Sequence, residues 1–173
     1  MARSISIRTV AFRSSEPTYA TETDLLTGKG GRDNGGRWNP PSSFATVYTS
    51  LTDTTALAEA KANYLYYGLD PADALPRTIV AIDVKLAKVL DFTDGNLRRI
   101  MGISAARMRK DDWRALNRRS AESLTQAVGR AAYETGAEAL IVPACDAKKN
   151  LVWFPGNLLT ASKAKVRNLD NLR

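Results

Sequence analysis

The stretch from Gly28 to Phe44, GKGGRDNGGRWNPPSSF, constrains the fold more than any other part of the chain. Five of the eleven glycines fall between Gly28 and Gly36, and RWNPP follows directly. Glycine costs backbone entropy on folding, so such a cluster is typical of a chain that needs positive φ angles or close approach to another group. The two prolines then fix an extended exit. We predict a loop that presents backbone N–H groups and one guanidinium to an anionic small molecule, with a glycine-rich surface turn as the alternative.

Length and composition predict one domain over residues 1–173, and the pattern of short strands and helices described below predicts that it is α+β. The chain is 44% hydrophobic and 25% charged, which is ordinary for a protein that buries its own core. No apolar run approaches the ~18 residues that span a bilayer, and MARSISIRTVAFR lacks the apolar centre of a signal peptide. The single cysteine, Cys145, excludes an internal disulfide. We expect a cytoplasmic protein that does not bind membranes.

Histidine is absent, and this excludes a large set of mechanisms. There is no Ser–His or Cys–His couple, and one cysteine with no histidine cannot build a zinc site, so we expect no metal. Acid–base chemistry must rest on carboxylates, tyrosine, lysine or arginine. Neither a P-loop nor a GxGxxG motif occurs, which disfavours the nucleotide-binding folds built on them.

Hydrophobic periodicity predicts short strands mixed with helices. Strands are expected over 5–12, 45–50, 77–86, 88–92, 139–143 and 151–154, and the tail after Lys163 is expected to add an edge strand or to fray. Helices are expected over 54–67 and 122–135. Between residues 94 and 122 the chain has helical character, with breaks at Gly102 and around 117–120.

The net charge of +7 suggests an anionic partner. Eight lysines and arginines fall between Arg98 and Arg119. This basic segment is compatible with a nucleic-acid surface, a solvated helix face or a dock for an acidic protein. Because no aromatic interleaving and no nucleic-acid motif accompany it, we do not expect direct nucleic-acid binding.

Glu59 lies on the helix predicted over 54–67. The apolar stripe of that helix is expected to include Leu57, Ala60 and Tyr64, which leaves Glu59 on another side, where a glutamate is usually solvated. Its place in the chain favours a function instead. The helix directly follows the strand that carries Tyr48, and that strand follows the glycine segment, so the three are expected to converge on one cleft.

Several motifs in a fixed order resemble the RES-domain family over about residues 8–160. They are FR (12–13), GGRWNPP (35–41), VYTS (47–50), ALAEA (56–60), TQAVGRAAYETGAEALIVPA (125–144) and NLVWFP (150–155). The members are the toxins of Xre–RES toxin–antitoxin pairs. The resemblance implies a fold similar to that of ADP-ribosyltransferase toxins: a split, mixed β core with flanking helices and an NAD⁺ cleft. It also implies NAD⁺ as substrate and a cognate Xre-family antitoxin as partner.

When the functional residues of the family are placed on the matching motifs of this sequence, the resemblance assigns catalysis to Glu59, Arg37 and Tyr48. NAD⁺ binding is assigned to the same three residues and to Arg13, Gly36 and Asn39. Asn39 has an alternative role, holding its own loop through a bond to the backbone, and Trp38 is expected to be a packing anchor. The serine that usually follows the Val-Pro pair in this family is Ala144 here, with Cys145 next.

Cleavage of the nicotinamide–ribose bond is compatible with the residues of this chain, because its oxocarbenium-like transition state needs no histidine, metal or thiol. Glu59 is expected to hold the ribose hydroxyls and stabilise the developing positive charge. The arginines would bind the pyrophosphate, and Tyr48 would orient the nicotinamide ring. The resemblance therefore implies a toxin that consumes NAD⁺ by hydrolysis or phosphorolysis. ADP-ribosylation of a host protein, a member that has lost catalysis and a basic nucleic-acid-binding module are the alternatives.

Overall fold

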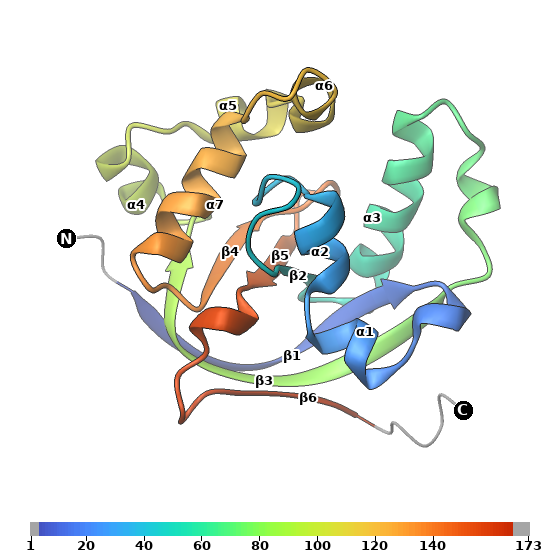
Figure 1. Cartoon of the computed structure of the whole chain (residues 1–173), viewed down its shortest axis with the longest axis horizontal. Helices are drawn as coiled ribbons and strands as arrows, with labels where there is room; N and C mark the ends of the chain where they lie inside the picture. The colour runs from blue at the N-terminus through green and yellow to red at the C-terminus, as the bar shows by residue number, and fades with distance from the viewer. Residues whose placement is uncertain (1–3, 168–173) are drawn as a thin grey trace.

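The computed structural model describes residues 4–167, which form a mixed β barrel flanked by helices (Figure 1). The strands are β1 (Ile5–Ser15), β2 (Val47–Ser50), β3 (Thr78–Asp91), β4 (Ala139–Pro143), β5 (Lys149–Trp153) and β6 (Lys163–Val166). The α-helices are α1 (Glu22–Leu26), α2 (Lys29–Asn34), α3 (Asp53–Tyr66), α4 (Gly95–Ile100), α5 (Ala105–Lys110), α6 (Trp113–Asn117) and α7 (Leu124–Glu134). Within this described part, no helix has the length and apolar character that a membrane crossing requires.

The sheet closes on itself. Its order is β1-β2-β5-β4-β3-β6, and β1 also pairs with β3, so five strands form a ring with β6 along one edge of β3. The β3–β4 pair is parallel and the other pairs described are antiparallel. On the remaining side β1 meets β2 only where Phe12 lies opposite Ser50, and the ring is weakest there. The predicted split, mixed β core is confirmed.

Two apolar clusters lie on the two faces of the β4–β5 pair. Ile141 and Leu151 belong to the cluster inside the barrel, and Leu140 and Val152 belong to the cluster under α7. Alternate residues of each strand therefore bury both faces, which explains why both strands are nearly continuous apolar runs in the sequence. The cluster under α7 also contains Trp38, 2% exposed, which confirms it as a packing anchor.

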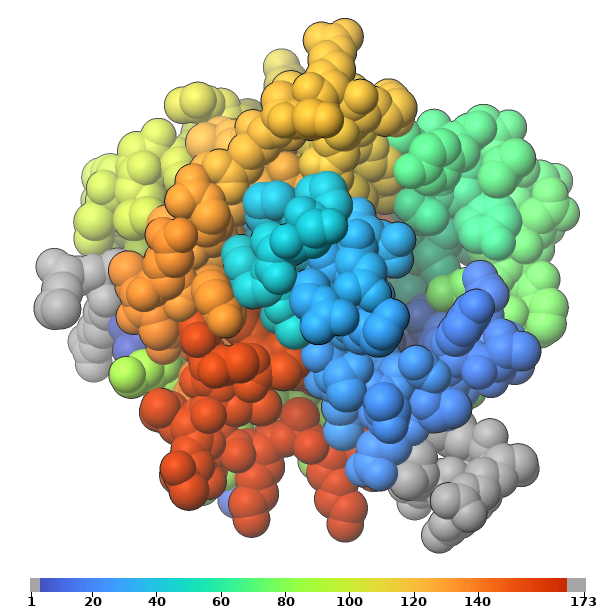
Figure 2. Space-filling view, viewed as in Figure 1, coloured from blue at the N-terminus to red at the C-terminus, as the bar shows by residue number. Residues whose placement is uncertain are grey.

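The helices surround the ring unevenly (Figure 1). In this view α7 and α3 stand on opposite sides of the β4–β5–β2 surface, and α5 and α6 lie above it between them. Helix α2 and the chain that follows it lie in front of the strands, and Figure 2 shows this blue-to-cyan segment packed between α7 (orange) and α3 (green). The helices thus enclose one face of the sheet on several sides.

The structure corrects the two strands predicted over 77–86 and 88–92, because β3 is a single strand from Thr78 to Asp91. The pairing of β3 with β1 is irregular near this point, between Ile5 and Ile7. The buried carboxylate of Glu138 accepts the N–H groups of Ala87 and Lys88 at 2.6 and 2.7 Å. A side chain distant in sequence thus satisfies the backbone where the sequence pattern weakens.

The glycine segment is also not the loop that we predicted, because residues 29–34 form α2. Gly28 begins the helix with φ +68°, and a Cβ at Gly31 would overlap the carbonyl of Thr46. Glycine is needed here for close packing of the helix on the backbone before β2, and this packing outweighs its poor helix propensity. The edge strand expected after Lys163 is present as β6, and the end of that tail, 168–173, lies outside the described residues.

Candidate active-site cleft

A cleft of about 510 Å³ lies between the sheet and the surrounding helices. Its floor is formed by Tyr48, Asn150 and Val152 of β2 and β5. The glycine segment lines it with Gly35 to Trp38, α3 with Glu59 and Asn63, and α5–α6 with Met108, Arg109, Trp113 and Arg114. A second hollow of about 260 Å³ lies beside the β1–β2 junction and shares four lining residues with the first, namely Tyr48, Glu59, Asn63 and Asn150. The two hollows meet at these four side chains.

Glu59 stands at this meeting point, and the structure fixes one of its oxygens. Oε1 accepts the backbone N–H of Cys145 at 2.9 Å and Nδ2 of Asn150 at 2.7 Å. Asn150 is held in turn by Ser50, whose hydroxyl donates to Asn150 Oδ1 at 2.7 Å. The two donors come from β5 and from the turn before it, so the carboxylate is held against the sheet while Oε2 makes no hydrogen bond within residues 4–167.

Helix α3 therefore presents a different face from the one we expected. Its buried residues are Thr55 and Ala56, and the residues that line the hollows are Ala56, Glu59, Ala60, Asn63 and Tyr64. Thr55 is fully buried and donates to Asp146 at 2.8 Å, which ties the start of α3 to the β4–β5 turn. Of the predicted stripe, Ala60 and Tyr64 line the smaller hollow and Leu57 lines neither. The prediction was wrong for Glu59, which lies on the same side of α3 as Ala60.

Arg37 connects the glycine segment to the opposite wall. Its Nη1 donates to the carbonyls of Met108 at 2.9 Å and Asp111 at 3.1 Å. Burial lowers the pKa of Arg37, and the nearby charge of Arg114 lowers it further, while the carboxylates of Asp111 and Glu59 oppose the shift. The guanidinium is thus placed in the cleft without an ion pair within 4 Å among the described residues.

Tyr48 lies in the cleft floor, but its hydroxyl is already engaged. Oη donates to Asn39 Oδ1 at 2.6 Å and accepts the N–H of Trp38 at 3.0 Å. Burial raises the pKa of Tyr48, so the phenol stays protonated. Gly36 lies directly against the ring, and a Cβ there would overlap Tyr48 Oη. Gly36 and Tyr48 both line the cleft, as the sequence predicts, and the hydroxyl also fixes the shape of the glycine segment.

Asn39 is fully buried and lines neither hollow. Its Nδ2 donates to the carbonyl of Gly31 at 2.7 Å and to that of Pro40 at 3.2 Å. The geometry therefore supports the alternative role of Asn39 as the residue that holds its own loop, and places it behind the cleft wall.

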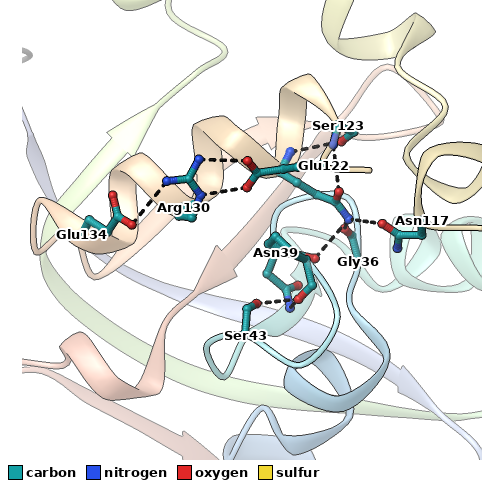
Figure 3. Close-up of polar contacts among 10 residues, drawn as sticks. Gly36, Asn39, Ser43, Asn117, Glu122, Ser123, Arg130 and Glu134 are labelled. Carbon is teal, nitrogen blue, oxygen red and sulfur yellow. Dashed lines mark hydrogen bonds and ion pairs between the residues drawn. The ribbon is translucent and has the colours of Figure 1, made fainter. Parts of the chain in front are cut away.

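Gln126 of α7 completes this wall and was given no role in the sequence analysis. Its Nε2 donates to the carbonyls of Gly36 at 2.9 Å and Asn39 at 3.3 Å, and to Asn117 Oδ1 at 2.9 Å (Figure 3). Its Oε1 accepts the N–H of Ser123, which completes a capping box. The Ser-x-x-Gln pattern was a visible signal for the cap, but not for the contacts to the glycine segment.

Arg13 is not brought to the cleft. It lies on the opposite face of β1 from Phe12 and Ser14, which line the smaller hollow. Its guanidinium donates to the carbonyl of Leu25 in α1. Burial lowers the pKa of Arg13, and the charge of Asp24 opposes this shift. In this arrangement Arg13 attaches α1 to the barrel.

Two arginines of the basic segment contribute to the cleft instead. Arg109 lies exposed at the rim and Arg114 lines the interior. With Arg37 they set three positive charges against the one negative charge of Glu59, a net of +2 along the lining. Within residues 4–167, no group of three histidine, cysteine, aspartate or glutamate side chains is arranged to hold a metal ion. The cleft is therefore suited to an anionic organic ligand.

Cys145 also lines the cleft, but as a thiol. Loss of solvation, with the negative charges of Glu59 and Asp146, raises its pKa to about 12. The thiolate is the nucleophilic form, so Cys145 is not activated at neutral pH. What Cys145 contributes is its backbone N–H, which Glu59 accepts.

Fold and cleft together define a small α+β domain whose closed mixed sheet carries one cationic cleft. The RES domain model matches residues 10–171, and the chain belongs to the RES-domain family. Two relatives, both named NAD(+) phosphorylase MbcT, come from Mycobacterium tuberculosis (strain ATCC 25618 / H37Rv) and Mycobacterium bovis (strain ATCC BAA-935 / AF2122/97). Each is 32% identical over 127 residues, which is 70% of this chain. The chain matches 61% of the length of these curated relatives.

A solved structure shows the same fold. A chain in the crystal structure of the M. tuberculosis MbcT–MbcA toxin–antitoxin complex superposes with a TM-score of 0.74. The match covers 98% of this chain and 91% of that chain at 23% sequence identity. The similarity confirms the architecture that the family resemblance implied.

Proposed function

We propose that this protein is the toxin of a toxin–antitoxin pair and cleaves the nicotinamide–ribose bond of NAD⁺. NAD⁺ is then the substrate and not a resident cofactor, and no metal takes part. The main support is the position of Glu59, whose carboxylate is fixed by Cys145 and Asn150 where the two hollows meet. The relatives named NAD(+) phosphorylase and the family match over residues 10–171 support this proposal, with the whole chain acting as one RES domain.

The chemistry follows from the groups in the cleft. The C–N bond breaks with its electron pair leaving on nicotinamide, which becomes neutral and needs no acid to leave. Positive charge develops on the ribose, and the carboxylate of Glu59 stabilises it. Arg37 binds a phosphate oxygen, and the ring of Tyr48 orients the base. A nucleophile then forms the new bond to the ribose carbon.

We favour inorganic phosphate as that nucleophile, because both relatives are named phosphorylases. Water is the second candidate. Transfer to a host protein is not favoured by the relatives. The nucleic-acid-binding alternative receives no support from the cleft, since Arg109 and Arg114 of the basic segment are part of its lining.

NAD⁺ consumption by the purified protein, with and without phosphate, tests this function. We expect Glu59→Gln to lower turnover about 100-fold or more, because it removes the charge that stabilises the transition state. Glu22→Gln, an exposed change in α1, is the matched control and is expected to retain full activity. Full activity of Glu59→Gln would contradict the site, and loss of NAD⁺ only when phosphate is present would identify the acceptor.

We also propose a cognate antitoxin of the Xre family as partner, and the cytoplasm as the compartment where both act. The support is the structurally similar chain, which was solved in a toxin–antitoxin complex. Arg107 and Lys110 of α5 are exposed and do not line the cleft, so their charges are available to a partner. Charge reversal at both positions is expected to weaken the complex in a pull-down and to leave NAD⁺ turnover unchanged. Unchanged affinity would exclude α5 from the interface.

A further inference from the structure

The basic segment places one arginine inside the cleft in a way that the family motifs do not indicate. We infer that Arg114 is a diphosphate-binding residue, which acts with Arg37 to hold the two phosphates of the dinucleotide. This inference rests on the proposed function and adds to it a residue from outside the RES motifs.

The side chain of Arg114 is held by neutral partners. Its guanidinium lies 4.3 Å from the ring centre of Trp113 and 4.6 Å from that of Tyr66. Its Nη2 donates to Asn63 Oδ1 at 2.6 Å. Two aromatic faces and an amide fix the plane of the guanidinium but do not neutralise its charge. Arg114 is therefore oriented before any ligand arrives.

Part of the hydrogen-bonding capacity of Arg114 is unused. Its Nε is buried and has no hydrogen-bond partner within residues 4–167. The carboxylate of Asp112, two residues earlier in the sequence, accepts instead from Tyr66 Oη and from the N–H of Ala115. Because Nε has almost no accessible surface, a ligand oxygen would bind instead to Nη1, which makes no hydrogen bond within residues 4–167 and is not among the buried unpartnered atoms.

Two other arginines, Arg130 and Arg167, are neutralised where they lie. Arg130 makes two bonds of 2.8 Å to Glu122 (Figure 3), and Arg167 binds both oxygens of Asp83. Neither Arg37 nor Arg114 makes an ion pair within 4 Å of a described carboxylate. Their charges are also close enough to act on each other, since Arg114 lowers the pKa of Arg37. The cleft thus contains two adjacent positive charges that an anionic ligand would neutralise.

A diphosphate fits this pair better than a single carboxylate or phosphate does. It carries one negative charge on each phosphate, and each can take forked donors from a guanidinium. The position relative to Glu59 also fits. Asn63, which binds Arg114, lies one helical turn after Glu59 on α3, an axial distance of about 6 Å. A ribose joined to the diphosphate can therefore reach Glu59 with the carbon of the breaking bond.

Direct binding measurements test this role without relying on turnover. ADP-ribose and nicotinamide are titrated into the full chain and followed by NMR, for the wild type, Arg114→Gln, Arg114→Lys and Arg119→Gln. Arg119 is an exposed residue of the same segment that does not line the cleft, so it is the matched control. NAD⁺ turnover is measured in parallel for each variant.

We expect Arg114→Gln to weaken ADP-ribose binding about 10- to 100-fold, the effect of losing charged hydrogen bonds. Nicotinamide binding by Arg114→Gln should stay within twofold of the wild type. The ADP-ribose affinity of Arg114→Lys should lie between those of the wild type and Arg114→Gln, and that of Arg119→Gln should match the wild type. KM for NAD⁺ should rise more than kcat falls. The inference would be overturned if Arg114→Gln left ADP-ribose binding unchanged. It would also be overturned if the variant weakened the binding of ADP-ribose and nicotinamide equally, because that result is expected when the α5–α6 segment is only displaced.

The proposed NAD⁺ cleavage and the diphosphate-binding role of Arg114 can be refuted independently. A wild-type protein that binds ADP-ribose through Arg114 but does not consume NAD⁺ would refute the proposed function and leave the diphosphate site standing. A protein that consumes NAD⁺ through Glu59 and binds ADP-ribose equally well without Arg114 would refute the inference alone.

Discussion

The two walls that face each other across the cleft are built by different means. The glycine segment, residues 28–41, is held by buried polar groups, among them Asn39 and Gln126 at 0% exposure. The segment of α5 and α6, residues 105–117, is anchored on one side by the buried Met108 and by Asp111, which accepts from the N–H and hydroxyl of Thr125 in α7. Its side toward α3 is held at the surface. Its contacts to α3 are those of Arg114 with Asn63 and of Asp112 with Tyr66.

The shape of the cleft and most of its positive charge therefore come from different segments. Buried hydrogen bonds in a low-dielectric interior specify one geometry, and breaking them leaves polar groups without partners. Exposed hydrogen bonds contribute little each, so the side of the α5–α6 segment that faces α3 is held less firmly than the glycine segment. The glycine segment fixes the shape of the cleft, and the α5–α6 segment supplies two of its positive charges, Arg109 and Arg114.

The largest effect is expected where α7 packs on the rigid wall. A Cβ at Gly129 would overlap the carbonyl oxygen of Trp38, so Gly129→Ala forces the helix away from the glycine segment. We expect a loss of about 3 kcal/mol in the free energy of unfolding, measured by urea denaturation. Gly30→Ala in α2 is the control, since nothing lies within 4 Å of its Cβ. There we expect no loss, and a gain of up to about 1 kcal/mol.

A smaller loss is expected from removing the amide of Gln126. Gln126→Leu keeps the volume but leaves the carbonyls of Gly36 and Asn39 without this donor, which should cost about 2 kcal/mol. NAD⁺ turnover should fall with it because the wall that carries Arg37 loosens. Arg130→Gln, on the exposed face of the same helix, should cost less than about 1 kcal/mol. Equal stability of the two variants would show that the glycine segment does not depend on this amide.

The smallest effect is expected at the other wall. Tyr66→Phe removes the 2.8 Å bond to Asp112 and keeps the ring beneath Arg114. Global stability should change by less than about 0.5 kcal/mol, while amide hydrogen exchange in α6 should become faster. Unchanged exchange in α6, or a global loss as large as that of Gln126→Leu, would show that both walls are built alike.

The parts of the fold that follow from local pattern were predictable. Helix α7 has clear periodicity, α3 has recognisable end signals, and β4 and β5 are short apolar runs, and the structure confirms these four elements within a few residues. Helix α2 and the continuous β3 were not predictable in this way. They depend on the Thr46 backbone and on Glu138, partners that only the folded chain brings together.

The residues of the cleft were likewise predictable only in part. The family motifs point to Arg37, Gly36, Tyr48 and Glu59, and all four line it. Arg13 and Asn39 come from the same motifs but bind backbone carbonyls away from it. Arg114 could not be selected from a run of basic residues, because only the docking of α6 on α3 decides which charge faces inward.

Glu59 takes one of its two anchors from the main chain at position 145, and this affects how the site can evolve. A backbone amide is supplied by every amino acid except proline, so mutations in this codon can change the rim of the cleft without removing the donor. The exposed side chain at 145 is thus free to vary with the ligand or the antitoxin. Ala144, which stands in place of the usual serine, is buried beside this donor, and the N–H of Cys145 binds Glu59 without any contribution from the side chain at 144.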